Sequence, residues 1–261
     1  AWFISKIPAK EKPVEILKKK NGFQEWLEVT RFLFKEPVVL VLSLLKSGLA
    51  VAGGIMTLIP LMASQVLSKP AMLSLGIGIL YSARGLGAAL GPLLVKRLFG
   101  ETSTVLHWSI AASFFLKAGS YLFIANSENL WTLSFGVAAA TLFGSIIWVF
   151  SSALIHLSTP DRYLGRVFSF ELAVMTLVMG ISNWGVGFAV DGLGLTFNQV
   201  ALWMAALVIL PGLFWTGFLT FVRKKLQQGD CVGSICPIDP SGFNPLPLVH
   251  EGQIEKKVQE K

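Results

Sequence analysis

The sequence predicts an all-α protein, a polytopic membrane bundle of six transmembrane helices. Apolar residues make up 53% of the 261 residues and charged residues 14%, whereas ordinary soluble domains carry about 25% charged residues. Most of the long segments are apolar all round, unlike a helix with one face in water. With a mean hydropathy of +0.64, the chain has the composition of a membrane protein.

Six apolar segments each have about the 20 residues needed to cross the ~30 Å hydrocarbon layer of a membrane. They lie at about 38–62, 73–95, 104–124, 130–155, 167–190 and 200–222. Residues that break helices or form turns separate them: Pro37, Lys69 with Pro70, GETST, ANSEN, STPDRYLGR and DGLGLTFNQ. The chain therefore divides into a linker at 1–37, a six-helix bundle at 38–223 and a tail at 224–261.

The linker before the first span is charged and is expected to lie in the cytoplasm. Its first residues, AWFISKIP, resemble the exit of an earlier apolar helix, so we expect the chain to be a fragment. An amphipathic helix is predicted within the linker, either on the membrane surface or packed on the protein's own loops. The residues that recur there at helical spacing are Phe23, Trp26, Leu27, Thr30, Leu33 and Phe34.

The basic residues orient the bundle. Eight Lys or Arg precede Val38, two lie at 96–103, two at 156–166 and six from Arg223 onward, whereas the alternate loops contain only Lys69. By the positive-inside rule, both termini face the cytoplasm. The net charge of +7 is thereby explained without a nucleic acid partner.

Two further stretches are distinctive: LYSARGLGAALGPLLVKRLFG lies in the second span, and LSTPDRYLGRVFSFELAVMTLVMGISNWGVGFAVDGLG leads into the fifth. With the basic linker and six spans, they resemble the major facilitator superfamily, more narrowly its bacterial drug and siderophore exporters. The resemblance implies a polytopic fold of twelve helices with a central pathway, of which this chain is the C-terminal half. It also implies the bilayer of a bacterial plasma membrane, the cell inner membrane, and a missing N-terminal six-helix half, or a second copy, as partner.

The loop after the second span departs from this family. It keeps Lys96, Arg97 and Gly100 but lacks the acidic residue that the family often carries before the arginine. A conformational charge latch at this loop is therefore not supported by the sequence, although the two basic residues remain candidates for conformational charges.

The resemblance implies a secondary active transporter that exports a small-molecule substrate by alternating access, with proton coupling as one option. The alternative is a non-transporting scaffold, or remnant half-transporter, that acts through helix association. No catalytic residues, metal or cofactor are expected, because the spans contain no nucleophile with a base and no ligand set. Cys231 and Cys236 are expected to be free thiols in a Pro-rich and Gly-rich, disordered cytoplasmic tail.

Arg84 is a permanent cation almost in the middle of the second span. An arginine at the bilayer centre costs at least ~2.5–3.5 kcal/mol, so we expect it to point inward, into a cavity or an interhelical ion pair. It shares a face with small residues whose spacing favours close helix packing: Gly76, Ala83, Gly87, Ala88 and Gly91. The opposite face is bulky and suits lipid: Leu75, Ile79, Leu86, Leu90 and Leu93.

Three other ionisable residues interrupt the spans. Lys46 and Glu171 lie in the cytoplasmic halves of their helices, so they either pair or each extend to the interface. Lys117 is close enough to the extracellular end of its helix to reach that interface. Glu171 is the only acidic residue well inside a span and is therefore the proton-carrier candidate.

The pathway hypothesis also involves Arg84, which either attracts an anionic group of the substrate or pairs with a carboxylate whose protonation drives exchange. Tyr81 and Asn183 are weaker candidates for ligand contact. Polar residues in spans also bridge helices without touching a ligand, for about 0.6 kcal/mol each.

The motif STPDRYLGR predicts the start of the fifth helix. Ser158 or Thr159 is expected to cap it, Pro160 to occupy the first turn and Asp161 to favour its positive end. Two arginines follow at the cytoplasmic headgroup level, where they either face lipid or pair with the partner half in one access state: Arg162 and Arg166.

Overall fold

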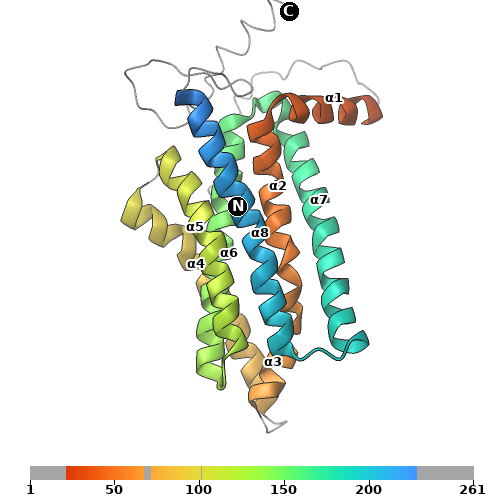
Figure 1. Ribbon diagram of the computed structural model, residues 1–261, viewed down its shortest axis with the longest axis vertical. Helices are drawn as coiled ribbons and strands as arrows, with labels where there is room; N and C mark the ends of the chain where they lie inside the picture. Colours follow the sequence, from red (N-terminus) through yellow and green to blue (C-terminus); the bar gives the residue numbers. More distant parts are fainter. Residues whose placement is uncertain (1–21, 68–71, 101, 228–261) are drawn as a thin grey trace, which may run out of the picture.

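Six long helical spans run side by side in the computed structural model, which describes residues 22–67, 72–100 and 102–227 (Figure 1). No strand occurs in these ranges, so the predicted all-α bundle and its count of six spans are confirmed. The first span consists of α2, Pro37–Val51, a short 3₁₀ helix η2, Gly53–Leu58, and α3, Ile59–Val66. The other spans are α4, Leu73–Phe99; α5, Ser103–Ala125; α6, Leu130–Ser158; α7, Asp161–Gly187, with a π-helical turn at Phe188–Gly192; and α8, Phe197–Gln227.

The fifth span begins six residues earlier than predicted, at Asp161 instead of 167. Because α6 continues to Ser158, only Thr159 and Pro160 link α6 to α7. The predicted cap by Ser158 or Thr159 is therefore wrong: Pro160 occupies the N-cap position, and no side chain caps α7. Asp161 does lie in the first turn, where a carboxylate interacts favourably with the helix dipole.

The helix α1, Gly22–Lys35, lies across one end of the bundle (Figure 1). We name this the basic end, because it carries the cations of the α4–α5 and α6–α7 connections and of the last turn of α8: Lys96, Arg97, Arg162, Arg166, Arg223, Lys224 and Lys225. Val29 and Leu33 of α1 are buried, whereas Leu27 and Phe34 are exposed. The tail expected at 224–261 lies outside the described residues beyond Gln227.

Contacts between α1 and α7 are specific. The ring of Phe32 stacks on that of Tyr163 with 4.5 Å between centroids, and Arg162 donates to Glu28 Oε1 at 2.9 Å. The helix therefore packs on the protein's own fifth span and also leaves an apolar edge exposed.

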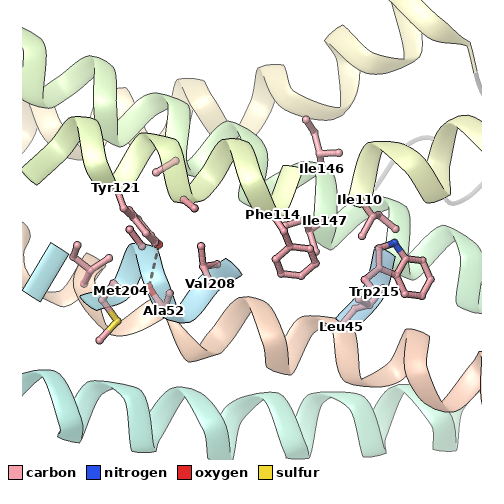
Figure 2. Packing of buried hydrophobic residues seen from close by; sticks show 14 of the residues in the cluster. Leu45, Ala52, Ile110, Phe114, Tyr121, Ile146, Ile147, Met204, Val208 and Trp215 are labelled. Carbon is pink, nitrogen blue, oxygen red and sulfur yellow. Dashed lines mark hydrogen bonds between the residues drawn. The ribbon is translucent and has the colours of Figure 1, made fainter. Parts of the chain in front are cut away.

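The core lies where α5 and α6 pack together. α4 packs mainly on α6, α5 also packs on α8, and α2 packs on α7. Aromatic side chains fill the space between α5, α6 and α8, with Phe114 and Trp215 fully buried (Figure 2). Trp215 Nε1 donates to the carbonyl of His107 at 3.1 Å, so the one polar atom of this buried side chain has a hydrogen-bond partner within the protein.

Two spans are much less buried than the others. In their most apolar stretches, 17% of the second span and 11% of the fifth are buried, against 61% of the first. Large side chains along α4 and α7 are exposed as a result, among them Leu75, Leu86, Leu93, Leu177 and Trp184. These faces of α4 and α7 are open to lipid or to another protein surface.

Candidate functional site

A buried ion pair joins α2 to α7. Lys46 Nζ lies 3.0 Å from Glu171 Oε2, and the two side chains are 3% and 0% exposed. Lys46 Nζ also donates to Ser152 Oγ of α6 at 2.7 Å. The sequence left open whether these residues pair or extend separately to the interface, and the structure shows the pair.

The surroundings of the buried pair include two aromatic rings. Lys46 Nζ lies 4.7 Å from the centroid of the Trp148 ring and 5.5 Å from that of Phe168, so ring faces add to its stabilisation. The second carboxylate oxygen, Glu171 Oε1, is buried and has no hydrogen-bond partner among the residues that the structure describes. An oxygen of this kind can accept a proton without breaking any other contact of the site.

Lys117 is buried in α5, contrary to the expectation that it reaches the membrane interface. Its Nζ donates to the carbonyl of Ala140 in α6 at 3.1 Å and lies 5.1 Å from the centroid of the Tyr121 ring. The physical reason is Gly144: a Cβ there would lie 3.1 Å from Lys117 Nζ. The missing side chain leaves room for the ammonium inside the bundle.

Arg84 is partly buried, and its face of α4 packs on α6. Gly87 of that face meets Ala138 and Thr141 of α6, and Gly91 meets Leu142 and Ser145, so closely that a Cβ would collide with them. Arg84 has no hydrogen bond or ion pair with any residue that the structure describes. The ion-pair alternative predicted for it is therefore not found in this part of the chain.

The first span is broken after Val51, and side chains from two other helices bind the freed backbone groups. Tyr121 Oη donates to the carbonyl of Ala52 at 3.0 Å (Figure 2). Ser182 Oγ donates to the carbonyl of Val51 at 2.7 Å and accepts from Gly54 N–H at 3.1 Å. A helix break inside the membrane is tolerated only where other protein groups form hydrogen bonds with the freed backbone N–H and C=O groups. Sequence reasoning missed this feature, although the adjacent glycines Gly53 and Gly54 signal it.

Replacing Tyr121 by phenylalanine is expected to lower the free energy of unfolding by about 1 kcal/mol, because the Ala52 carbonyl loses its donor. Thermal or denaturant unfolding in detergent micelles measures the change. Tyr163→Phe is the matched control, since its hydroxyl makes only a 3.5 Å contact with Glu28 outside the core. Equal effects of the two variants would contradict this role of Tyr121.

The remaining predicted site residues are not gathered at one place. Tyr81 is exposed on α4, and Asn183 on α7 has a buried Oδ1 that meets no hydrogen-bond donor in the described part of the chain. The predicted conformational charges lie at the basic end, where Arg162 binds Glu28 of α1: Lys96, Arg97, Asp161, Arg162 and Arg166. Of the predicted packing residues, Gly87 and Gly91 contact α6, as described above, and Ala83 lies one turn before Gly87 on α4.

Comparisons with known proteins give one distant similarity. No protein-family model matches the chain, and no solved structure matches it. Over 158 residues it is 28% identical to the enterobactin exporter EntS of Salmonella choleraesuis (strain SC-B67). The similar segment covers 59% of this chain and 36% of that exporter, so the match spans about a third of the relative's length.

The fold, the charged groups held inside it and this similarity together define the class. The chain is a transporter-like integral membrane protein, with six apolar helices and a transporter, not an enzyme, as its relative.

Proposed function

We propose that the chain is the C-terminal half of a secondary active transporter of the major facilitator type, which exports a small molecule by alternating access from a bacterial plasma membrane. The observation that carries the proposal is the Lys46–Glu171 pair, a charged contact inside a membrane bundle. Ionisable groups are rare within spans and mark ion or substrate pathways. The distant similarity to an exporter supports the same class.

Glu171 carries the coupling proton in this proposal. A proton from one side of the membrane binds the carboxylate, whose Oε1 has no hydrogen-bond partner within residues 22–67, 72–100 and 102–227. The neutral acid no longer attracts Lys46, which keeps its bond to Ser152 of α6, and so the contact between α2 and α7 weakens. Release of the proton to the other side restores the ion pair and resets the bundle.

The exposed faces of α4 and α7 receive the N-terminal half in this proposal. Both helices leave most of their apolar stretches uncovered, and both carry polar groups that a central pathway would use, Tyr81 and Asn183 among them. The scaffold alternative needed the small-residue face of α4 to be free for a partner. Gly87 and Gly91 already pack on α6, so that observation no longer favours a scaffold.

The test is transport by the complete product of the gene in proteoliposomes with an imposed proton gradient. Glu171→Gln is expected to abolish proton movement coupled to substrate, because the amide cannot bind and release the proton. Asp191→Asn, an exposed acidic residue of the same span, is the matched control and should transport normally.

Two results would contradict the proposal. If proton movement coupled to substrate is unchanged in Glu171→Gln, then Glu171 is not the proton carrier. Full transport by residues 1–261 alone, as a monomer, removes the half-transporter assignment.

A further inference from the structure

One face of α1 combines large apolar side chains with cations. Four of its residues are exposed: Leu27, Arg31, Phe34 and Lys35. At about 100° of rotation per residue, the four positions fall within about 100° of one another around the helix. The one acidic residue at positions 27–35 is Glu28, which binds Arg162 of α7 at 2.9 Å. The exposed face is therefore both apolar and cationic.

The opposite face of α1 is fixed to the bundle. Val29 and Leu33 are buried there, and the ring of Phe32 stacks on that of Tyr163 with 4.5 Å between centroids. These contacts set the rotation of α1 about its own axis. The exposed face is thus directed away from the protein by the fold itself, and Phe34 is left 74% exposed.

The depth of α1 follows from its contacts with α7. Arg162 and Tyr163 belong to the first turn of α7. The fifth span has 32 residues, about 48 Å at 1.5 Å per residue, whereas a bilayer is about 40–45 Å thick with its headgroups and about 30 Å without them. The first turn of α7 therefore reaches the headgroup layer, and so does α1, which lies across the same end of the bundle (Figure 1).

A helix at headgroup depth that exposes apolar side chains next to cations has the properties of an interfacial helix. Leu27 and Phe34 suit the boundary of the acyl chains, and the long stems of Arg31 and Lys35 carry their charges to the phosphates. We propose that this face of α1 binds anionic phospholipids of the bilayer in which the bundle stands.

The charge of the basic end favours anionic over neutral lipid. An excess of Lys and Arg beside spans is typical of the cytoplasmic side, whose leaflet carries the anionic lipids. Each Lys or Arg near such a surface strengthens binding about fivefold. The face lies at the end of the bundle, away from the Lys46–Glu171 pair, so the inference does not depend on the proposed transport.

A fluorescent bimane group at position 34 tests the proposal. It is attached to Phe34→Cys in the full 261-residue chain, in which Cys231→Ser and Cys236→Ser remove the other thiols. The chain is placed in phosphatidylcholine vesicles that contain brominated phosphatidylglycerol or brominated phosphatidylcholine, because bromine quenches only a fluorophore that the lipid touches. With two cations on the face, half-quenching is expected at about 25-fold less of the brominated phosphatidylglycerol. A label at Leu27→Cys repeats the measurement at a second exposed position.

Charge variants assign the preference to α1. Arg31→Gln combined with Lys35→Gln is expected to make the two brominated lipids quench equally. Both side chains are exposed, so their replacement leaves the packing of α1 on α7 intact. The matched control is Lys224→Gln combined with Lys225→Gln, which removes the same charge from the last turn of α8 and should keep the preference.

Four outcomes would overturn the inference. Equal quenching by the two lipids with Arg31 and Lys35 in place would mean that lipid covers the face without selection for charge. A preference that survives in the double variant of α1 would place the anionic lipid elsewhere. Quenching by aqueous iodide but by neither lipid would place the face in water. Quenching by neither iodide nor lipid would mean that protein, such as a second copy of the chain, covers it.

Discussion

Lys46→Met is expected to lower the free energy of unfolding by about 3–5 kcal/mol, among the largest effects of any single substitution in this bundle. The reason is the carboxylate that remains. Glu171 is fully buried, and with Lys46 gone neither of its oxygens keeps a hydrogen-bond partner within the described residues. A buried charge without its partner costs far more than the pair contributes.

The double variant Lys46→Met with Glu171→Met separates the two effects. It is expected to recover most of the lost stability, since neither charge then has to be desolvated. Unfolding of the single and double variants in the same detergent completes the cycle. A loss below about 1 kcal/mol in Lys46→Met would show that water reaches the pair and that the site is not dry.

Gly87→Ala is expected to destabilise the bundle by about 1–3 kcal/mol, as overpacking of a tight contact usually does. A Cβ at Gly87 would collide with the carbonyl oxygen of Ala138, and backbone in α6 cannot rotate away as a side chain could. The added methyl group therefore forces α4 away from α6, the helix on which it mainly packs. Thermal unfolding measures the loss.

Gly85→Ala, two residues earlier in the same helix, is the matched control. A Cβ there meets nothing within 4 Å, and alanine has the better helix propensity by up to about 1 kcal/mol. Its stability should equal or slightly exceed that of the unmodified protein. Equal losses of stability in Gly85→Ala and Gly87→Ala would mean that the contact of Gly87 with α6 does not cause the destabilisation.

The spans and the faces of α4 could be predicted from sequence because one physical requirement governs each. Hydrocarbon thickness fixes the length of an apolar helix, and so the six spans were found. On α4, helical periodicity alone separates Gly87 and Gly91 from Leu86 and Leu93. In the structure the two glycines meet α6 and the two leucines are exposed.

Features that depend on another helix could not be predicted. Lys117 is buried where Gly144, 27 positions further along, leaves space for its ammonium and the carbonyl of Ala140 accepts its hydrogen bond. At the break after Val51, Tyr121 and Ser182 supply hydrogen-bond donors for the backbone carbonyls from α5 and α7. No periodicity within one segment contains this information, which arises from the packing of distant segments.

The Lys46–Glu171 pair also has a consequence for biogenesis. Its partners are 125 residues apart, and a ribosome adds about 5–20 residues per second, so the glutamate is synthesised roughly 6–25 s after the lysine. For that interval the first span stands in the bilayer without its counter-charge, and the long lysine stem lets the ammonium reach the headgroups. The buried pair can form only after the fifth span has been synthesised, when the four spans before it are already complete.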